Sequence, residues 1–420
     1  MDNPAKIPIV QEMNYDTDIL IVGGGLNGSA LAISLASVGF DVIVLDRQSA
    51  APTRADNFDG RAYALSYASC QMLKVLGVWN HVTDNAQPIL DIKVSDGRAG
   101  EGAAPMYVHF DHQELEEGPM GHLLEDRYLR RAFGDVIKEL PNITYLNDSD
   151  VIAQKTDDLG GNVTLADGRE LRARLLVGCD GRGSQVAQRA NIKRRGWDYE
   201  QTALVCAVSH ELPHNGTAHQ FFTPAGPLAI LPLPGNKSSI VWTESTQRAA
   251  DINALDDAGY LAALAPVFGD FLGKVDLAGD RFTYPLTLSL ADSFISERIA
   301  LLGDAAHGIH PLAGQGLNLG LKDIAALAEV LAIAARRGED IGTKPVLARY
   351  QQWRRFDTAA MAVATDGINR LFSNDHSLLR GIRDLGLGAV NATPNLRRGF
   401  MRHAAGLSNE LPKLLKGQVI

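Results

Sequence analysis

Short apolar runs, separated by glycine-rich turns and amphipathic stretches, dominate the first half of the chain. Residues 18–22 (DILIV) and 41–45 (DVIVL) are two such runs, and a helical stretch at 26–38 lies between them and ends before Gly39. Apolar runs of this length are typical of strands that are buried on both faces of a parallel sheet. The pattern therefore predicts a strand–helix–strand unit at the beginning of the fold.

The same reasoning extends the prediction along the chain. Further buried strands are expected at 175–177 and 298–302, and the expected helices lie at 58–80, 123–140, 256–268, from Gly316 onward and over most of 345–420. Alternating or apolar runs predict a largely antiparallel sheet with strands at 202–209, 219–222, 228–233, 239–243 and 282–288. The expected fold class is α/β, with a Rossmann-like unit interleaved with this mostly antiparallel sheet and with helices at the C-terminal end.

Composition excludes several classes of protein. Of the 420 residues, 45% are hydrophobic and 21% are charged, which is typical of a globular chain with two or three domains. The net charge of −9 argues against nucleic-acid binding, because such domains are usually basic. The three cysteines lie far apart and have neither disulfide-framework nor metal-ligand spacing, so no metal site is expected. The first 16 residues lack the apolar core of a signal peptide, so we expect a cytoplasmic protein.

The turn after the first predicted strand matches the dinucleotide-binding pattern G-x-G-x-x-G at Gly23, Gly25 and Gly28. The first glycine permits a tight turn, the second lets a pyrophosphate approach the backbone, and the third lets the helix pack on the strand. The helix N-terminus favours the phosphate charge. Asp46 lies at the end of the next strand, where a carboxylate accepts hydrogen bonds from ribose hydroxyls. This pattern alone does not distinguish NAD from FAD.

A second turn with a glycine and an acid lies far along the chain. Gly303 and Asp304 directly follow a predicted buried strand, and the run GIHPLAGQGLNLG at 308–320 then leads into a long helix. Its proline and glycines predict an exposed loop, here called the flavin loop (residues 306–320). The N–H groups of this loop and the helix dipole would stabilise the negative charge of a reduced flavin ring. Two such turns match the two ends of one long cofactor, FAD.

These elements resemble those of the class A flavoprotein monooxygenases, the p-hydroxybenzoate hydroxylase fold group. Asp180-Gly181, which also follows a predicted buried strand, matches the DG motif of this group, and Gly303-Asp304 matches its GD motif. Residues 303–323 further resemble the ubiquinone-biosynthesis hydroxylases of the UbiH, UbiF, UbiI and VisC type, as do 59–66 (DGRAYALS) and 406–417 (GLSNELPKLLKG). The resemblance extends over nearly the whole chain.

The resemblance implies an FAD-dependent monooxygenase that hydroxylates the aromatic ring of a polyprenylated ubiquinone precursor. It implies O2 and NAD(P)H as co-substrates and a flavin C4a-hydroperoxide as the hydroxylating species. By the same resemblance Asp46 would hold the adenosine ribose, Arg127 would lie near the pyrophosphate and Asp304 would meet the ribityl–phosphate region. Gly316, Leu317 and Asn318 would approach the flavin ring. The other residues expected at the cofactor are Gly23, Gly25, Gly28, Arg47, Asp180, Gly303 and Gly314.

No catalytic base can be named from the sequence. Arg61, expected near the flavin or the substrate mouth, and His307 in the flavin loop are the catalytic candidates, and His219 and His310 are candidates by residue type only. A surface salt bridge explains the arginine equally well, and a structural hydrogen bond explains a loop histidine. The wall of the substrate site is expected from apolar and aromatic residues of the inserted sheet, at 221–224 and 228–234.

The elements divide the chain into interleaved regions. Residues 16–85, 121–190 and 291–345 are expected to form a discontinuous FAD-binding domain, and 86–120 and 191–290 the sheet of the substrate domain. Residues 346–420 are expected to form a C-terminal helical region.

The C-terminal region differs in charge from the rest of the chain. Residues 371–420 contain seven Lys or Arg and three Asp or Glu, whereas the whole chain is acidic. This pattern predicts either a solvated helical face or a helix that docks on a membrane surface or a biosynthetic complex, in which case the protein would be peripheral to the inner membrane. The basic residues are Arg380, Arg383, Arg397, Arg398, Arg402, Lys413 and Lys416.

Two other functions remain open from the residues alone. The first is another flavin oxidoreductase of the same fold, such as a halogenase or a dehydrogenase. Halogenases of this fold carry a W-x-W-x-I-P segment, and none of the four tryptophans lies in one. The second is a non-catalytic flavoprotein of a quinone-biosynthesis complex, against which the complete flavin loop argues. The residues do not determine the hydroxylated ring carbon, the choice of NADH or NADPH, or the oligomeric state.

Overall fold

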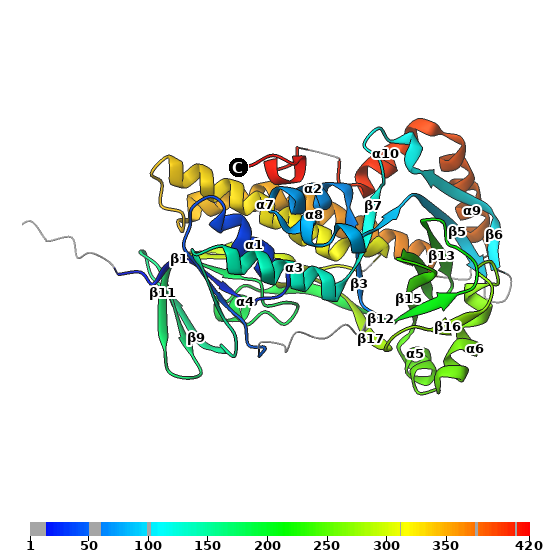
Figure 1. The fold of residues 1–420 in the computed structure, drawn as a ribbon, viewed down its shortest axis with the longest axis horizontal. Coiled ribbons are helices and arrows are strands. Elements are labelled where there is room, and N and C mark those ends of the chain that lie inside the picture. The colour runs from blue at the N-terminus through cyan, green and yellow to red at the C-terminus, as the bar shows by residue number, and fades with distance from the viewer. Residues whose placement is uncertain (1–13, 50–59, 99–101, 311, 374–376, 408–409) are drawn as a thin grey trace, which may run out of the picture.

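Two large sheets lie side by side, with helices packed above them (Figure 1). The structure is a computed structural model and describes residues 14–49, 60–98, 102–310, 312–373, 377–407 and 410–420. Asp59 and Pro311, which belong to two of the motifs above, lie outside the described residues. The expected α/β architecture, with a Rossmann-like unit interleaved with a mostly antiparallel sheet and followed by C-terminal helices, is confirmed.

The first sheet has a parallel centre in the strand order β19-β11-β1-β2-β8. A short antiparallel strand adds to one edge, and a hairpin extends the beginning of β11. Because the central strands are parallel, the turns that follow them meet at one carboxyl edge. The strands are β1 (Thr17–Val22), β2 (Val42–Leu45), β8 (Ile143–Leu146), β9 (Val151–Thr156), β10 (Gly161–Leu165), β11 (Glu170–Gly178), β18 (Ile295–Ser296) and β19 (Ile299–Leu301).

Helices cover the first sheet and form the largest apolar core with it. Side chains of β1, such as Ile19 and Ile21, are fully buried against helix residues such as Leu31 and Leu327. Apolar side chains on both faces of the central strands explain the uninterrupted apolar runs in the sequence. The helices around this core are α1 (Leu26–Ala36), α2 (Tyr67–Val75), α3 (Asp126–Glu139), α4 (Gln185–Arg189), α7 (Gln315–Arg336) and α8 (Lys344–Phe372).

The second sheet is antiparallel except for the parallel pair β5 and β13. Helices α5 (Thr246–Asn253) and α6 (Asp257–Phe268) cover one of its faces, where Trp242 and Tyr260 lie in a separate core. The strands are β5 (Asp91–Arg98), β6 (Gly102–Asp111), β12 (Arg194–His210), β13 (Thr217–Thr223), β14 (Gly226–Leu233), β15 (Lys237–Ser245), β16 (Val275–Leu277), β17 (Phe282–Ala291) and β20 (His307–Gly308). Since β20 belongs to the flavin loop, its pairing with β17 joins the loop to this sheet.

A three-stranded sheet of β3 (Ala62–Ser66), β4 (Gln87–Ile89) and β7 (Gly121–Glu125) corrects two predicted helices. The helices expected at 58–80 and 123–140 are shorter, because β3 and β7 form the first part of each stretch. These strands pair with each other across almost 60 positions of sequence, which local periodicity cannot indicate. Each strand continues directly into its helix, and Ser66 caps α2 by accepting the N–H of Ser69.

The C-terminal helices pack back onto the second sheet. Helix α9 (Ser377–Ala392) lies against β6 and β5, and α10 (Pro394–Ala404) follows it at the upper right of Figure 1. Ion pairs fasten these helices: Arg383 Nη2 lies 3.0 Å from Asp96 Oδ2, and Arg397 Nη2 lies 2.7 Å from Glu114 Oε1. None of the helices in the described ranges is both long enough and apolar enough to cross a membrane.

Candidate functional site

Four predicted turns lie next to one another at the carboxyl edge of the first sheet. The register pairs Val22 with Leu45 and Gly178, and Gly178 in turn with Leu301. Asp46, Gly23, Asp180 and Asp304 therefore follow four adjacent strands in this spatial order. With strands about 4.8 Å apart, the turns at the two ends, those of Asp46 and Asp304, are separated by about 14 Å. The fold thus brings the two distant acidic turns to the two ends of one edge.

Each glycine of the first turn has a distinct spatial reason. Gly23 has a φ of +104° and lies against Cys179 and Asp180, so a side chain there would collide with the neighbouring turn. A Cβ at Gly28 would overlap the carbonyl oxygen of Gly23. Only a glycine at this position therefore lets α1 pack so closely on the end of β1. At Gly25 a Cβ would meet nothing within 4 Å, which leaves open space at the N-terminus of α1.

Asp46 is held at the end of β2 by groups that the sequence did not indicate. Its Oδ1 accepts the N–H of Gln48 at 2.9 Å, and its Oδ2 lies 3.1 Å from the hydroxyl of Tyr145. That hydroxyl also lies 2.7 Å from the carbonyl oxygen of Gly24, so it joins the glycine turn to the acid. Burial and the charge of Asp46 raise the pKa of Tyr145, which keeps it protonated as a donor. Arg47 is exposed beside this cluster.

The turn of Gly303 and Asp304 is fastened from several directions. Gly303 has a φ of +55°, and its N–H donates to Asp323 Oδ2 at 3.0 Å. Asp304 Oδ2 lies 3.2 Å from Nε of Arg182, which comes from the loop after Asp180. Arg194 donates to the carbonyl oxygens of Asp304 and Ala305. The side chain of Asp304 is 41% exposed.

His307 belongs to a buried ionic network rather than to an open site. Its Nε2 lies 2.5 Å from Oδ2 of Asp323, and Nε of Arg354 donates to the other oxygen of this carboxylate at 2.8 Å. Burial alone would raise the pKa of Asp323, but the charges of His307 and Arg354 outweigh it and lower this pKa. Since the side chains of His307 and Asp323 are almost fully inaccessible, we infer a structural role for His307.

The N-terminus of α7 carries the residues expected near the flavin ring. Gly314 has a φ of +63° and begins the helix without a side-chain cap, and Gly316 has open space where a Cβ would lie. Leu317 packs against the large core. The Asn318 side chain is buried: it accepts the N–H of Ser66 and the hydroxyl of Ser69, and it donates to Ala64. Through Ala64, Ser66 and Ser69, Asn318 therefore ties α7 to β3 and α2. Because its side chain is used in these hydrogen bonds, only its backbone remains for contact with a cofactor.

The side chain of Asp180 caps a helix. Its Oδ2 accepts the N–H groups of Gln185 and Val186 at the start of α4, at 2.7 and 3.1 Å. Its Oδ1 is buried and has no hydrogen-bond partner among the described residues. Capping is a sufficient structural reason for this acid, and cofactor contact remains a prediction for it.

Arg61 and Arg127 lie near the small three-stranded sheet and form ion pairs there. Arg61 Nη2 lies 3.3 Å from Asp126 Oδ2, and its guanidinium lies 5.7 Å from the ring centre of Phe282 on β17. Arg127 Nε donates to Glu125 at 2.6 Å. Arg61 thus stands where the cofactor frame meets the second sheet, and the catalytic role expected for it stays a prediction. The role of Arg127 at the pyrophosphate likewise stays a prediction.

A small cavity lies where the flavin loop faces the second sheet. Its volume is about 10 Å³, and His310 and Leu312 of the loop face side chains of β13, β14 and β15 across it. His310 is fully buried, yet neither of its ring nitrogens has a hydrogen-bond partner among the described residues. The sheet residues that line the cavity are Gln220, Pro227, Ala229, Val241 and Thr243. An aromatic ring is larger than this cavity, so its binding must displace lining side chains.

The apolar sheet residues expected as the substrate wall divide between this cavity and ordinary packing. Pro227 and Ala229 line the cavity, whereas Phe221 and Leu228 belong to the core under α5 and α6. His219 packs against the rings of Phe221 and Phe271 rather than facing the flavin loop. Of the three histidines His219, His307 and His310, His310 is the one that lines this cavity.

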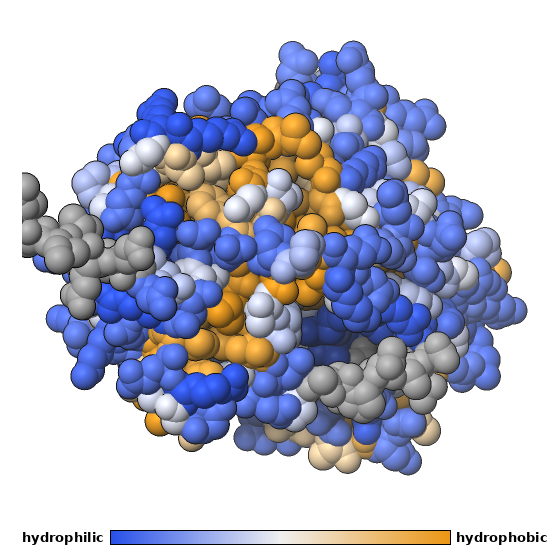
Figure 2. Space-filling view, turned by 60° about the vertical axis from the view of Figure 1, so that its left-hand side comes forward, coloured by the Kyte–Doolittle hydropathy of each residue, from blue (hydrophilic) through white to orange (hydrophobic). Residues whose placement is uncertain are grey.

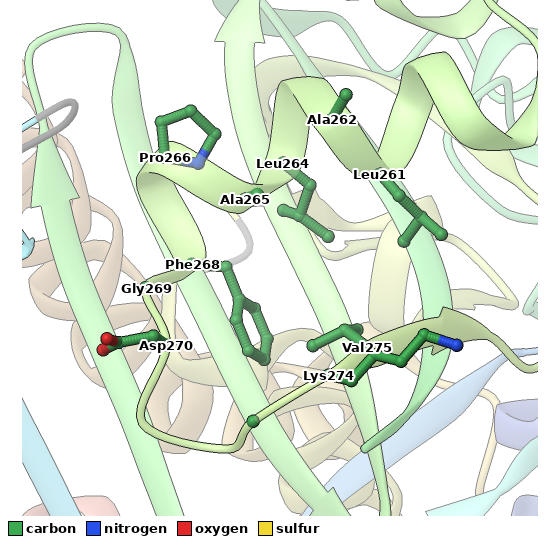
Figure 3. A pocket seen from close by; sticks show the side chains of 11 residues that line it. Leu261, Ala262, Leu264, Ala265, Pro266, Phe268, Gly269, Asp270, Lys274 and Val275 are labelled. Carbon is green, nitrogen blue, oxygen red and sulfur yellow. The ribbon is translucent and has the colours of Figure 1, made fainter. Parts of the chain in front are cut away.

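Two further hollows lie at the surface. Figure 2, which brings the side of the first sheet forward, shows hydrophobic residues gathered across the middle of this face and a hollow below and to the right of them. A separate hollow of about 710 Å³ lies between α6 and β16, where Leu264 and Phe268 point inward and Asp270 and Lys274 lie at the rim (Figure 3). None of the residues predicted for the cofactor or for catalysis lines this second hollow.

Comparison with known proteins identifies the family. A family model described as "FAD binding domain" matches residues 16–364 of this chain. The chain belongs to this family. It is 45% identical over 413 residues to "Ubiquinone hydroxylase UbiL" of Rhodospirillum rubrum, covering 98% of this chain and 95% of the relative. It is 38% identical over 397 residues to "3-demethoxyubiquinol 3-hydroxylase" of Escherichia coli, covering 94% of this chain and 100% of that one.

A solved structure agrees on the fold. The p-nitrophenol 4-monooxygenase PnpA from Pseudomonas putida superposes with a TM-score of 0.78 at 20% identity, covering 95% of this chain and 100% of that chain. The resemblance to class A FAD monooxygenases and to ubiquinone-biosynthesis hydroxylases is thereby confirmed, and the cofactor of this FAD-binding family member is FAD.

The residues at the carboxyl edge fit this cofactor. Helices α1 and α7 both begin without a side-chain cap and without an acidic residue in the first turn. Gly25 and Gly316 leave open space at these two N-termini, where free N–H groups attract the charge of a pyrophosphate and of a reduced flavin ring. The buried Asn27 Oδ1 in the first turn of α1 has no partner among the described residues. Asn27 also lies against Gly303 and Gly320, so the two helix N-termini are close together.

Sequence reasoning missed the residues that support this edge from a distance. Tyr145, Arg182, Arg194, Asp323 and Arg354 each fasten a turn to an element from another part of the chain. Their side chains carry no pattern of their own, because the contacts depend on strand order. Two of them lay within predicted elements without a role being assigned: Asp323 ends the 303–323 run, and Arg182 directly follows Asp180-Gly181.

Proposed function

We propose that this protein is an FAD-dependent monooxygenase that hydroxylates the aromatic ring of a polyprenylated ubiquinone precursor, with O2 and NAD(P)H as co-substrates. Membership of the FAD-binding family and extended similarity to ubiquinone hydroxylases support the reaction class. The geometric observation that carries the proposal is the cavity between the flavin loop and the second sheet, where a ring would lie between the cofactor frame and an apolar wall.

Residues of this chain have separable tasks in this proposal. When bound, reduced FAD activates O2 and supplies the oxygen atom that the ring receives. The N-terminus of α1 and Asp46 would hold the pyrophosphate and the adenosine ribose, and the N-terminus of α7 would stabilise the negative charge of the reduced ring. Pro227, Ala229 and Leu312 would keep water away from the reacting ring.

His310 is the residue we propose for the substrate hydroxyl. Burial, only partly offset by the charge of Asp366, lowers the pKa of His310 to about 4, so its ring is neutral at physiological pH. A neutral imidazole has one nitrogen that accepts a proton and one that donates. A phenol is activated for attack on electrophilic oxygen when its hydroxyl is strongly hydrogen-bonded or deprotonated. His310 can therefore accept a hydrogen bond from the phenol hydroxyl at one nitrogen, while the proton stays on the phenol because the pKa of His310 is lowered.

The test is hydroxylation by the purified holoprotein. It is supplied with NADH or NADPH, a short-chain prenylated phenol that lacks one ring hydroxyl, and isotopically labelled O2. Mass spectrometry should find one labelled oxygen atom in the product, and the same method applied to a deletion strain would identify the accumulating precursor and hence the ring carbon. Flavin that is reoxidised without hydroxylating any demethylated quinone precursor would instead favour another flavin oxidoreductase or a non-catalytic flavoprotein.

Peripheral membrane docking is part of the proposal because a polyprenyl chain partitions into the bilayer. Three of the seven basic C-terminal residues, however, are paired within the fold, whereas Arg398 and Lys416 are exposed. Arg383 is buried with Asp96, and Arg397 and Arg402 pair with Glu114 and Glu117. The side chain of Arg380 lies outside the described part of the structure. The three paired arginines therefore contribute little to a docking surface.

A further inference from the structure

Helix α8 is apolar on two opposite faces. On one face, Met361 and Ala362 are buried against Ile309 and Leu319 of the flavin loop and α7. On the other face, Phe356 and Val363 have exposed fractions of 81% and 73%, and Ile368 and Leu371 of 41% each. A surface helix normally has a polar outer face, and a helix that is apolar all round is normally buried. The outer face of α8 is therefore more apolar than the solvent-exposed face of a surface helix normally is.

The composition of this outer face is specific. Ten residues between Arg355 and Leu371 are exposed; eight are apolar, two are arginines and none is acidic. Phe356, Val363, Gly367 and Leu371 recur at helical spacing and form a stripe about 22 Å long. We call these exposed residues of 355–371 the α8 face. Its large apolar members are Phe356, Val363, Ile368 and Leu371.

The charge of the α8 face is opposite to that of the whole molecule. The chain has a net charge of −9, yet the exposed charges of this face are Arg355 and Arg370. The neighbouring acids form ion pairs: Asp357 pairs with the buried Arg354, and Asp366 pairs with Arg370 and balances its charge, so the net positive charge of the face comes from Arg355. An apolar stripe flanked by arginines complements a bilayer that has anionic headgroups.

The α8 face is continuous with the cavity at the flavin loop. Leu371 is exposed at the end of the stripe, and the next residue, Phe372, is buried. The ring of Phe372 stacks on Phe222 of β13 with 4.2 Å between the ring centres, and Leu312 completes this cluster. Leu312 also lines the cavity. Packed apolar side chains therefore connect the outer end of α8 to the lining of the proposed substrate site.

We infer that the α8 face docks on an anionic lipid bilayer, so that the polyprenyl chain of the substrate remains in the apolar phase while the ring reaches the cavity past Phe372. The passage of the substrate rests on the proposed function, whereas the affinity for lipid rests on the surface alone. Leu396, Phe400 and Arg398 are exposed on α10 and repeat the composition of the α8 face.

The experiment sediments the full-length holoprotein with vesicles of phosphatidylcholine, with and without phosphatidylglycerol. The wild type should bind the anionic vesicles. The double variant Phe356→Gln, Val363→Gln should bind them about tenfold more weakly, since two exposed apolar side chains no longer enter the bilayer. Arg355→Glu should weaken binding about fivefold or more on anionic vesicles only. The matched control is Ile152→Gln, Val419→Gln, because these side chains are 55% and 76% exposed away from α8; it should bind like the wild type.

Several outcomes would overturn the inference. They are a wild type that binds neither vesicle, a double variant that binds like the wild type, and a wild-type dimer that the double variant converts to a monomer without any vesicle binding. In the last case a second copy of the chain occupies the face. Flavin absorbance checks that each variant is folded. Vesicle binding without hydroxylation of a short-chain precursor would contradict only the proposed function, and hydroxylation without vesicle binding would contradict only the docking.

Discussion

Single residues at the flavin loop differ sharply in what surrounds them. His307 and His310 are three positions apart and both buried, but His307 bonds to Asp323 whereas both nitrogens of His310 lack a partner among the described residues. An unpaired buried imidazole is costly unless a ligand satisfies it. This contrast supports the structural role inferred for His307 and the substrate-facing role proposed for His310.

Replacing His310 with alanine should reduce hydroxylation while leaving the flavin bound. Loss of an activating hydrogen bond worth about 1.4 kcal/mol costs about tenfold in rate. NAD(P)H oxidation should continue, with hydrogen peroxide released in place of hydroxylated product. The ratio of product to NAD(P)H consumed is the measurement. His219→Ala is the control, because His219 packs among aromatic rings away from the cavity. Unchanged coupling in His310→Ala would remove this residue from the mechanism.

Gly25 offers a test of the cofactor site that spares the fold. Its backbone, with φ −63° and ψ −170°, suits any residue, and the space where a Cβ would lie is open. Gly25→Val should cost about 1 kcal/mol of stability as a poorer N-cap. Its side chain would occupy the expected pyrophosphate position, so FAD affinity should fall at least about tenfold. Titration of the apoprotein with FAD measures this. Gly134→Ala in α3, also next to open space, is the control; full flavin retention in Gly25→Val would contradict the placement.

Long-range polar contacts join elements of this fold in addition to apolar packing. Helix α7 supplies Asp323, which holds the turn at Gly303, and α8 supplies Arg354, which neutralises that carboxylate. Lys322 and Asp357 extend the network, with 3.7 Å between Nζ and Oδ2. These groups are mostly buried, so each charge depends on its partners. The network therefore couples the position of the cofactor turn to the packing of α7 on α8.

Asp323→Asn should destabilise the protein by about 3–5 kcal/mol, because it leaves buried cations without a compensating charge. Urea unfolding of the apoprotein is the measurement, since bound FAD would add its own stabilisation. The matched surface pair is Asp292 with Arg195, which is 83% exposed at the side chain; Asp292→Asn should cost less than about 1 kcal/mol. Equal losses of unfolding free energy in the two variants would show that the buried network stabilises the protein no more than a surface ion pair does.

The whole molecule should respond to acid in two windows. Burial lowers the pKa of His122, His219 and His310 to about 4, from an ordinary value of 6.5. Between these values the unfolded chain binds protons that the folded chain does not, so stability falls as the pH falls from 6.5 to about 4. Asp323 and Asp357 have lowered pKa values, for which opposing charges outweigh burial, and they lose their contribution only at lower pH.

The measurement is the unfolding free energy of the apoprotein against pH. Each of the three histidines contributes a slope of at most about 1.4 kcal/mol per pH unit in the upper window. His310→Gln should reduce the slope there without changing the lower window. His81→Gln, at an exposed position, is the control. A stability that stays constant from pH 6.5 to pH 4 would mean that these rings are not held neutral by the fold.

The sequence by itself determined those features that depend on residues close together in the chain: buried strands, tight turns and short motifs. Apolar runs followed by glycine and acid predicted β1, β2, β11 and β19 with their turns, because a strand buried on both faces has a local composition and a tight turn has local steric needs. The same motifs, through the resemblance they carry, indicated the FAD-binding family. Local patterns did not separate β3 and β7 from the helices that follow them, since both strands owe their existence to pairing with each other.

Only the tertiary structure decided the rest. The order of parallel strands put Asp46 and Asp304 at the two ends of one edge, and side chains from distant segments, such as Tyr145 and Arg354, fixed the turns between them. Packing distinguished His310 from His307 and turned an apolar face of α8 outward. The physical reason is that a residue's own neighbours in sequence set its backbone conformation. Its solvent exposure and its polar partners depend on which remote elements pack against it.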